Sequence, residues 1–176
     1  MKHNRRKWAT AILATAALAS ALPITSQGVP LARDLALDGR QAERSCVPLL
    51  LEFAADDCDY CTLLEEEILN PTLLDRDYDQ RVLMRKLVLD PGIRIIDFTG
   101  KQTDATHLAS RYKVFVTPTL LFVDRHGAEL AERMVGVTTL EFYGGYLDQA
   151  LDTARERLGK QVECQEHIFE PRPPLS

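Results

Sequence analysis

The stretch that decides the fold is VPLLLEFAADDCDYC, which occupies residues 47–61. Its first part, residues 47–54, is a nearly continuous apolar run of the length typical of a strand buried on both faces of a sheet. Two aspartates then break the run, and a helical pattern begins at Cys58. The stretch therefore predicts a buried strand that leads directly into the start of a helix, with two cysteines at the junction.

Those two cysteines, Cys58 and Cys61, are separated by Asp59 and Tyr60. Two cysteines one helical turn apart can close a small disulfide, and the dipole and free N–H groups of a helix start stabilise the thiolate of the first. The thiolate is the species that attacks a disulfide, and a second thiol can then resolve the mixed disulfide. The spacing favours a redox-active pair in which Cys58 attacks and Cys61 resolves.

Two other interpretations of the pair stay open. The same spacing forms half of a zinc site, and Cys164 and His167 have the spacing of a second half. The pair could also be a purely structural disulfide, although so small a ring constrains little of the unfolded chain. Because an exported protein favours disulfides, we expect no metal.

The other elements are predicted from hydrophobic periodicity, turn residues and helix caps. In chain order we expect a helix in 31–45, a strand in 82–89, a loop or small hairpin in 93–103, a helix in 104–113 capped by Asp104, strands in 119–123 and 128–136, and a last helix from Thr138 or Thr139 to about Leu158, ended by Gly159. Helices interleaved with strands and followed by a hairpin imply an α/β fold with a central mixed sheet and helices on both faces.

A second motif, Thr117-Pro118-Thr119-Leu120, lies downstream of the cysteine pair. Residues 51–61 together with this motif resemble the thioredoxin superfamily, and are most similar to secreted bacterial thioredoxin-related proteins. The likeness covers residues 31–158 and implies a thioredoxin-like fold and thiol–disulfide oxidoreductase activity.

The resemblance also implies roles for particular residues. Pro118 matches the family's cis-proline, which would expose the backbone of Thr117 to a substrate strand; a trans proline at a strand edge is the alternative. With these two residues, Asp59 and Tyr60 make up the expected substrate-binding set. Glu52 matches a buried acid that moves a proton to or from the second cysteine, although a glutamate that points to water would fit the same position.

Gly136 matches a glycine near the end of the last strand, where close approach to the active-site loop is expected. The sequence also departs from the family pattern. Asp57 stands where thioredoxins usually carry a tryptophan, and three aspartates at positions 56, 57 and 59 surround Cys58 with negative charge. This charge opposes the helix dipole and disfavours the thiolate, so we predict a reductase or an isomerase and not a strong oxidase.

Two further groups of residues carry predictions. In the implied fold, Cys46 and Cys164 lie at the end of the sheet opposite the dithiol, where they could pair as a structural disulfide, remain unpaired or pair between chains. The run Glu65-Glu66-Glu67 is most simply an exposed helix face.

The N-terminus predicts export. Residues 1–21 hold a basic start, a short apolar run and a small-residue cleavage pattern, so we expect a signal peptide cleaved after Ala21 and a periplasmic or otherwise exported product. An uncleaved anchor is the alternative. We expect a linker in 22–30, a thioredoxin-like domain in 31–159 and a tail in 160–176, with no membrane span after cleavage.

The net charge and the sequence motifs restrict the classes of partner and cofactor that we expect. The net charge of −5 gives no electrostatic footprint for nucleic acid. No phosphate-binding or dinucleotide fingerprint is present, so we expect no cofactor beyond the dithiol. The resemblance implies protein disulfide substrates, a membrane thiol-transfer protein as electron donor, and a monomer. A binding or chaperone-like module with little redox activity stays open, as does an isomerase, although residues 22–45 are too short for a dimerisation domain.

Overall fold

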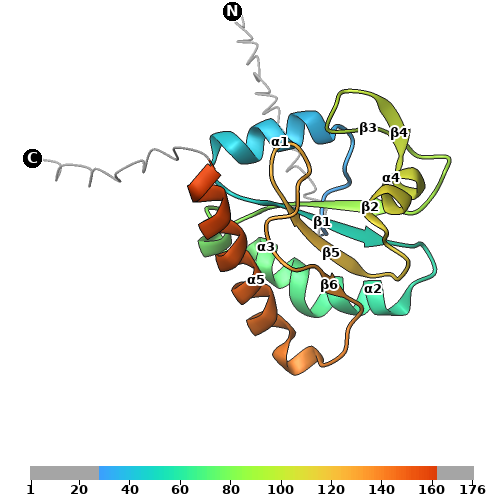
Figure 1. Ribbon diagram of the computed structural model, residues 1–176. Coiled ribbons are helices and arrows are strands. Elements are labelled where there is room, and N and C mark those ends of the chain that lie inside the picture. The colour runs from blue at the N-terminus through green and yellow to red at the C-terminus, as the bar shows by residue number, and fades with distance from the viewer. Residues whose placement is uncertain (1–27, 162–176) are drawn as a thin grey trace, which may run out of the picture.

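A mixed sheet lies at the centre of the structure, a computed structural model that describes residues 28–161 (Figure 1). Its strands run in the order β2-β1-β5-β6, and a separate hairpin pairs β3 with β4. The strands are β1 (Leu49–Ala54), β2 (Leu83–Val88), β3 (Arg94–Ile96), β4 (Gln102–Asp104), β5 (Thr119–Val123) and β6 (Met134–Val135). The helical elements are α1 (Leu35–Arg44), α2 (Asp59–Leu64), the π-helical turn η1 (Glu65–Leu69), α3 (Asn70–Leu74), the 3-10 turn η2 (Arg76–Tyr78), α4 (Ala105–Tyr112) and α5 (Leu140–Gln161).

Strand β1 is central, as its apolar run predicts. It pairs in parallel with β2 and antiparallel with β5, and all six of its residues are buried. A strand covered on both faces must be apolar throughout, because neither set of alternating side chains meets water. Glu52 is the exception in the run, and its side chain is fully buried.

Helices cover both faces of the sheet (Figure 1). One apolar cluster joins α1 and α4 to one face, and includes Leu35, Leu51, Phe53, Leu108 and Leu121. The other cluster joins the α2–α3 segment and α5 to the opposite face, and includes Leu50, Leu64, Phe122, Leu147 and Leu151. The predicted α/β fold with a mixed sheet and helices on both faces is confirmed.

Two predicted elements differ from the structure. The strand expected in 128–136 is reduced to Met134–Val135 and a single bridge between Val123 and Glu129. Leu130 and Ala131 are consecutive and both buried, whereas a strand with one covered face would bury only alternate residues. The last helix continues through Gly159 to Gln161, so Gly159 lies within α5 and does not end it.

The remaining elements agree with their predictions. Residues 93–103 contain the β3–β4 hairpin, and the Asp104 side chain caps α4 by accepting a hydrogen bond of 2.8 Å from the His107 amide. Within residues 28–161, no helix combines the length and apolar character needed to cross a membrane.

The sheet topology brings the two sequence motifs to one end of the molecule. Phe53, near the end of β1, lies opposite Thr119, the first residue of β5. The chain that follows β1 carries the dithiol, and the chain that precedes β5 carries Thr117 and Pro118. This end of the sheet is therefore the candidate functional site.

Candidate functional site

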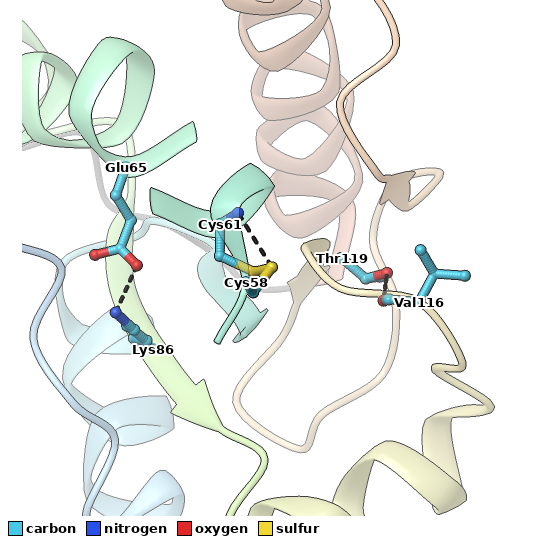
Figure 2. Close-up of a disulfide and its surroundings, with 6 residues drawn as sticks. All are labelled: Cys58, Cys61, Glu65, Lys86, Val116 and Thr119. Carbon is cyan, nitrogen blue, oxygen red and sulfur yellow. Dashed lines mark hydrogen bonds and ion pairs between the residues drawn. A yellow bond between two sulfur atoms is a disulfide. The ribbon is translucent and has the colours of Figure 1, made fainter. Parts of the chain in front are cut away.

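Cys58 and Cys61 are joined in a disulfide at the start of α2 (Figure 2). Their Cα atoms lie 5.2 Å apart. Cys58 occupies the N-cap position, and its Sγ accepts a hydrogen bond of 3.2 Å from the Cys61 amide. Cys58 is half-buried, whereas Cys61 is only 2% exposed. A partly exposed cysteine beside a covered one suits the order of attack and resolution expected for this pair.

The charged side chains around Cys58 are exposed. Asp56, Asp57 and Asp59 all lie on the surface. Their negative charge opposes the stabilisation that the N–H groups at the start of α2 offer a Cys58 thiolate. Because water screens exposed charges, we expect a modest opposing effect on the thiolate.

The loop before β5 carries the second motif. The Thr117–Pro118 peptide bond is cis, as the resemblance implied. The Thr119 hydroxyl donates a hydrogen bond of 2.7 Å to the carbonyl oxygen of Val116, which spans the two residues between them (Figure 2). Within residues 28–161, no hydrogen bond engages the backbone amide or carbonyl of Thr117. That backbone segment is open to pairing with an extended chain.

Gly136 lies beside this loop for a reason different from the one expected. Its amide donates a hydrogen bond of 2.8 Å to the Pro118 carbonyl oxygen, so the two segments are adjacent. A Cβ atom placed on Gly136 would meet no atom within 4 Å, so close packing does not require a glycine. Its φ of +67° does, because side-chain-bearing residues rarely adopt that conformation. Gly136 thus approaches the loop closely, as expected, but its positive φ and not a lack of space for a Cβ accounts for the glycine.

Several large apolar side chains are exposed in the segments that carry or adjoin the two motifs. Tyr60, between the cysteines, is 61% exposed, and Phe115, three residues before Pro118, is 87% exposed. Val116 in the same loop and Val135 in β6 are each 50% exposed. Large exposed apolar side chains that gather in one place are typical of protein-binding surfaces. Tyr60 and Asp59 are both exposed, and their predicted contact with substrate stays a prediction.

Glu52 lies in the core, in the strand that leads to the dithiol. Its side chain is 0% exposed, and within the described residues neither carboxylate oxygen has a hydrogen-bond partner. The alternative of a glutamate that points to water is therefore wrong. The pKa of Glu52 is raised to about 8: burial raises it most, the Glu65 carboxylate also raises it, and the Lys86 ammonium lowers it. A carboxyl group with a pKa near neutrality can both release and accept a proton in this pH range.

Two charged residues near Glu52 were missed as functional residues by sequence reasoning. The Lys86 Nζ lies 2.5 Å from the Glu65 Oε1 (Figure 2). Glu65 is half-buried, so the prediction of an exposed face holds for Glu66 and Glu67 and is wrong for Glu65. The available signal was the spacing of four residues between Cys61 and Glu65, which places both on the same side of a helix.

The second predicted cysteine pair is only partly described. Cys46 precedes β1 and therefore lies at the end of the sheet opposite the dithiol, and it is not a free cysteine. Leu158 and Gln161, near the end of α5, line the same small cavity as Val47. Cys164 lies outside the described residues, so its pairing with Cys46 stays a prediction.

The zinc alternative involves residues of which only half are described. Cys58 and Cys61 are bonded to each other, and no group of three or more histidine, cysteine or acidic side chains within residues 28–161 could hold a metal ion. Cys164 and His167 lie outside the described residues. In the described part of the chain the dithiol is a disulfide and not a ligand set.

The sheet order, the disulfide at a strand-to-helix junction and the adjacent cis-proline are features of a thioredoxin-like protein. A family model of the thioredoxin-like domain matches residues 35–151, and the chain belongs to this family. No curated protein sequence matches the chain.

Solved structures with a similar fold are thioredoxins. Thioredoxin O2 from Arabidopsis thaliana is 19% identical, with a TM-score of 0.45, and the match covers 68% of this chain and 91% of that one. A poplar thioredoxin h is 14% identical, with a TM-score of 0.46 and coverages of 67% and 95%. Mitochondrial thioredoxin 3 from Saccharomyces cerevisiae is 17% identical, with a TM-score of 0.44 and coverages of 70% and 93%.

Proposed function

We propose that this protein is an exported thiol–disulfide oxidoreductase that reduces disulfides of other proteins. The observation that carries the proposal is the Cys58–Cys61 disulfide, with one sulfur half-buried and the other covered, next to the open backbone of Thr117. Membership of the thioredoxin-like family supports the chemical class. The basic and apolar pattern in residues 1–21 supports export.

The reaction transfers two electrons and two protons to the substrate. In the reduced protein, the Cys58 thiolate attacks a substrate disulfide, a Cys58–substrate disulfide forms, and the other substrate sulfur leaves as a thiolate that takes up a proton. Cys61 then loses its proton to the Glu52 carboxylate and attacks the Cys58 sulfur. The Cys58–Cys61 disulfide forms and the second substrate thiolate leaves, taking up a proton in turn.

Substrate docking falls to the surface around the dithiol. An extended substrate segment would pair with the backbone of Thr117, next to Pro118, and lay apolar side chains against Tyr60, Phe115 and Val116. Their exposure supports this arrangement, because isolated domains seldom keep several large apolar side chains in one exposed place without a partner.

A reductase needs electrons from another dithiol protein. The Cys58–Cys61 disulfide is the redox group in this proposal, and a membrane thiol-transfer protein would return it to the dithiol form by the same exchange chemistry. The three exposed aspartates favour reduction of substrates over their oxidation. Their negative charge destabilises the Cys58 thiolate and therefore the reduced form, which makes the dithiol a better electron donor. A reduction potential near −120 mV, about that of the strongest periplasmic oxidant, would contradict it.

Trapping a mixed disulfide tests the proposal. A reduced Cys61→Ser variant keeps the attacking thiol and lacks the resolving one, so incubation with exported proteins should accumulate disulfide-linked adducts on Cys58. The matched control is Cys58→Ser, in which the remaining thiol of the pair is buried. Adducts on the first variant alone are expected, whereas equal amounts on both, or none on either, would overturn the assigned roles.

A second candidate is a binding module that keeps the fold and lacks fast redox chemistry. The exposed apolar side chains around the dithiol would serve such a module equally well. The two candidates differ in the effect of Cys58→Ser on substrate handling: a binding module would hold an unfolded protein with or without the thiol.

A further inference from the structure

Glu52 and Lys86 are neighbours on adjacent strands. Residue 52 of β1 lies opposite residue 86 of the parallel strand β2. Residues opposite each other in a sheet project their side chains to the same face, and neighbouring strands lie about 4.8 Å apart. An ammonium at this distance would be the natural counter-charge for the buried carboxylate.

Lys86 is instead bound by a different acid. Its Nζ lies 2.5 Å from the Glu65 Oε1, and the two side chains are only 23% and 15% exposed. Glu65 comes from η1, the π-helical turn that follows α2, one turn after Cys61. Figure 2 shows the Cys58–Cys61 disulfide between this ion pair and the Val116–Thr119 segment. Glu65 follows Cys61 by four residues, and Lys86 lies opposite Glu52 in the sheet, so the ion pair joins the segment that carries the dithiol to the strand next to Glu52.

We propose that Glu65 is a positioning residue that holds the Lys86 ammonium away from Glu52 and so leaves Glu52 free to exchange a proton with Cys61. This inference rests on the proposed dithiol chemistry. It follows from the count of charges: two carboxyl groups face one ammonium, and the geometry assigns that ammonium to Glu65, while both oxygens of Glu52 have no partner within the described residues.

The groups that face Glu52 come from every element packed around it. Lys86 comes from β2, Glu65 from η1 and Tyr143 from α5, while β5 contributes Leu120, which is apolar. Burial and the neighbouring Glu52 raise the pKa of Tyr143, so its hydroxyl stays neutral at physiological pH. Lys86 and Glu65 are then the two fixed charges that bear on Glu52, and they act in opposite directions.

The consequence concerns both directions of proton transfer. A pKa of about 8 leaves Glu52 mostly protonated at neutral pH, with a minor ionised fraction that can accept the Cys61 proton. If Lys86 were released to Glu52, the carboxyl group would stay ionised at neutral pH and could no longer return a proton to a Cys61 thiolate. Glu65 therefore keeps Glu52 within the range where it works as both acid and base.

Titration of the Glu52 side-chain carboxyl by carbon-13 NMR in the oxidised protein tests the inference without any substrate. Glu65→Gln should lower the Glu52 midpoint by about one pH unit or more, because an acid is removed and Lys86 is released. Lys86→Met should raise the midpoint, because the only attractive charge is lost. Glu66→Gln, which removes an exposed acid one position away, should leave it unchanged.

Opposite shifts in the first two variants separate a positioning role from a structural one. A merely structural ion pair would let both variants loosen the same region, and the Glu52 midpoint would move in the same direction in both. Unchanged midpoints, or shifts of equal sign, would overturn the inference. Glu65→Asp, which keeps the charge, should restore most of the wild-type midpoint.

Different results contradict the proposed function and the role of Glu65. A wild-type protein that reduces no protein disulfide contradicts the proposed function, whatever Glu52 does. An active wild-type protein whose Glu52 midpoint is unaffected by Glu65→Gln contradicts the role of Glu65 alone. In an active enzyme, the pH at which the rate of disulfide reduction changes should move with the NMR midpoint of each variant.

Discussion

Two buried acids at different places in the molecule have opposite properties. Glu52 lies in β1, the strand that leads to the dithiol, fully buried, with no hydrogen-bond partner among the described residues, and its pKa is raised to about 8. Asp97 lies in the turn between β3 and β4, 5% exposed, and its pKa is lowered to about 2. Burial raises the pKa of both groups, so burial alone does not explain the difference.

Asp97 is surrounded by donors. One carboxylate oxygen accepts hydrogen bonds from the Thr99 amide at 2.8 Å, the Thr99 hydroxyl at 2.7 Å and the Lys101 amide at 3.0 Å. The other oxygen accepts a hydrogen bond of 3.0 Å from the Arg111 guanidinium. These donors outweigh the desolvation of the charged form.

Asp97 stabilises the fold through its hydrogen bonds, whereas Glu52 has a pKa suited to proton transfer. Asp97 ties the β3–β4 turn to α4 and stays ionised. Glu52 gains nothing structural from its charge, because no donor reaches it within residues 28–161. An unsatisfied carboxyl group in a core costs stability, which fits the proton-transfer role proposed for Glu52.

The largest expected effect comes from removing the satisfied acid. Asp97→Ala takes the acceptors away from the Thr99 and Lys101 amides and leaves Arg111 without its partner. We expect a loss of about 3–4 kcal/mol in the free energy of unfolding, measured by urea denaturation at pH 7.

A matched control is Asp79→Ala. Asp79 is exposed, and its side chain makes no hydrogen bond within the described residues. The control should unfold at the wild-type urea concentration. If Asp97→Ala did the same, the donors around Asp97 would not stabilise the fold. Because the Asp97 pKa is lowered, its contribution should be present above pH 4 and fade as the pH falls through about 2.

The second prediction is a gain in stability, and it concerns Glu52. Its pKa of about 8 in the fold exceeds its ordinary value of 4.5, so the folded state binds the proton more tightly and stability falls as the pH rises between these values. The slope is at most about 1.4 kcal/mol per pH unit. Glu52→Gln should remove this slope and make the protein about 2–3 kcal/mol more stable than wild type at pH 9.

Urea denaturation at several pH values between 5 and 9 measures the slope. Glu66→Gln removes an exposed acid and should keep the wild-type profile. If wild type and Glu52→Gln showed the same dependence of stability on pH, titration of Glu52 would not be the cause of the slope. A Glu52→Gln protein should also reduce disulfides more slowly, since the variant side chain cannot exchange a proton.

The smallest expected effect concerns the exposed acids, which water screens. Asp57→Asn removes a negative charge next to Cys58 and should stabilise its thiolate by about 0.5 kcal/mol. Since the reduced form gains this stability, the reduction potential should rise by about 10 mV. Equilibration with glutathione measures it, with Asp79→Asn as a distant control. A lower potential in Asp57→Asn would contradict the direction of the charge effect.

Much of the fold could be predicted from sequence because its signals are local. The apolar run that forms β1, the Asp104 cap and the turn residues after β2 and β5 each act within a few positions. The strand after Gly127 was predicted too long, because the contacts that bury Leu130 and Ala131 together come from distant elements. Gly159 was predicted to end a helix that packing extends past it.

The residues of the candidate site also fall into those that could be predicted from sequence and those that could not. The cysteines and Pro118 form short motifs, so their positions could be predicted, and the burial of Glu52 follows from its place in an apolar strand. Lys86 and Glu65 were missed because their pairing joins η1 to β2 across 21 positions. A charge in a strand or a helix does not indicate its partner until the register between the strands is known.

The most direct test of the central claim is reduction of insulin disulfides with dithiothreitol as electron source, followed by the precipitation of the free B chain. The account predicts that wild-type protein accelerates precipitation well above dithiothreitol alone, and that Cys58→Ser removes the acceleration while the protein remains folded. An unaccelerated reaction with wild-type protein, or full activity in Cys58→Ser, would contradict the assignment of dithiol chemistry to Cys58 and Cys61.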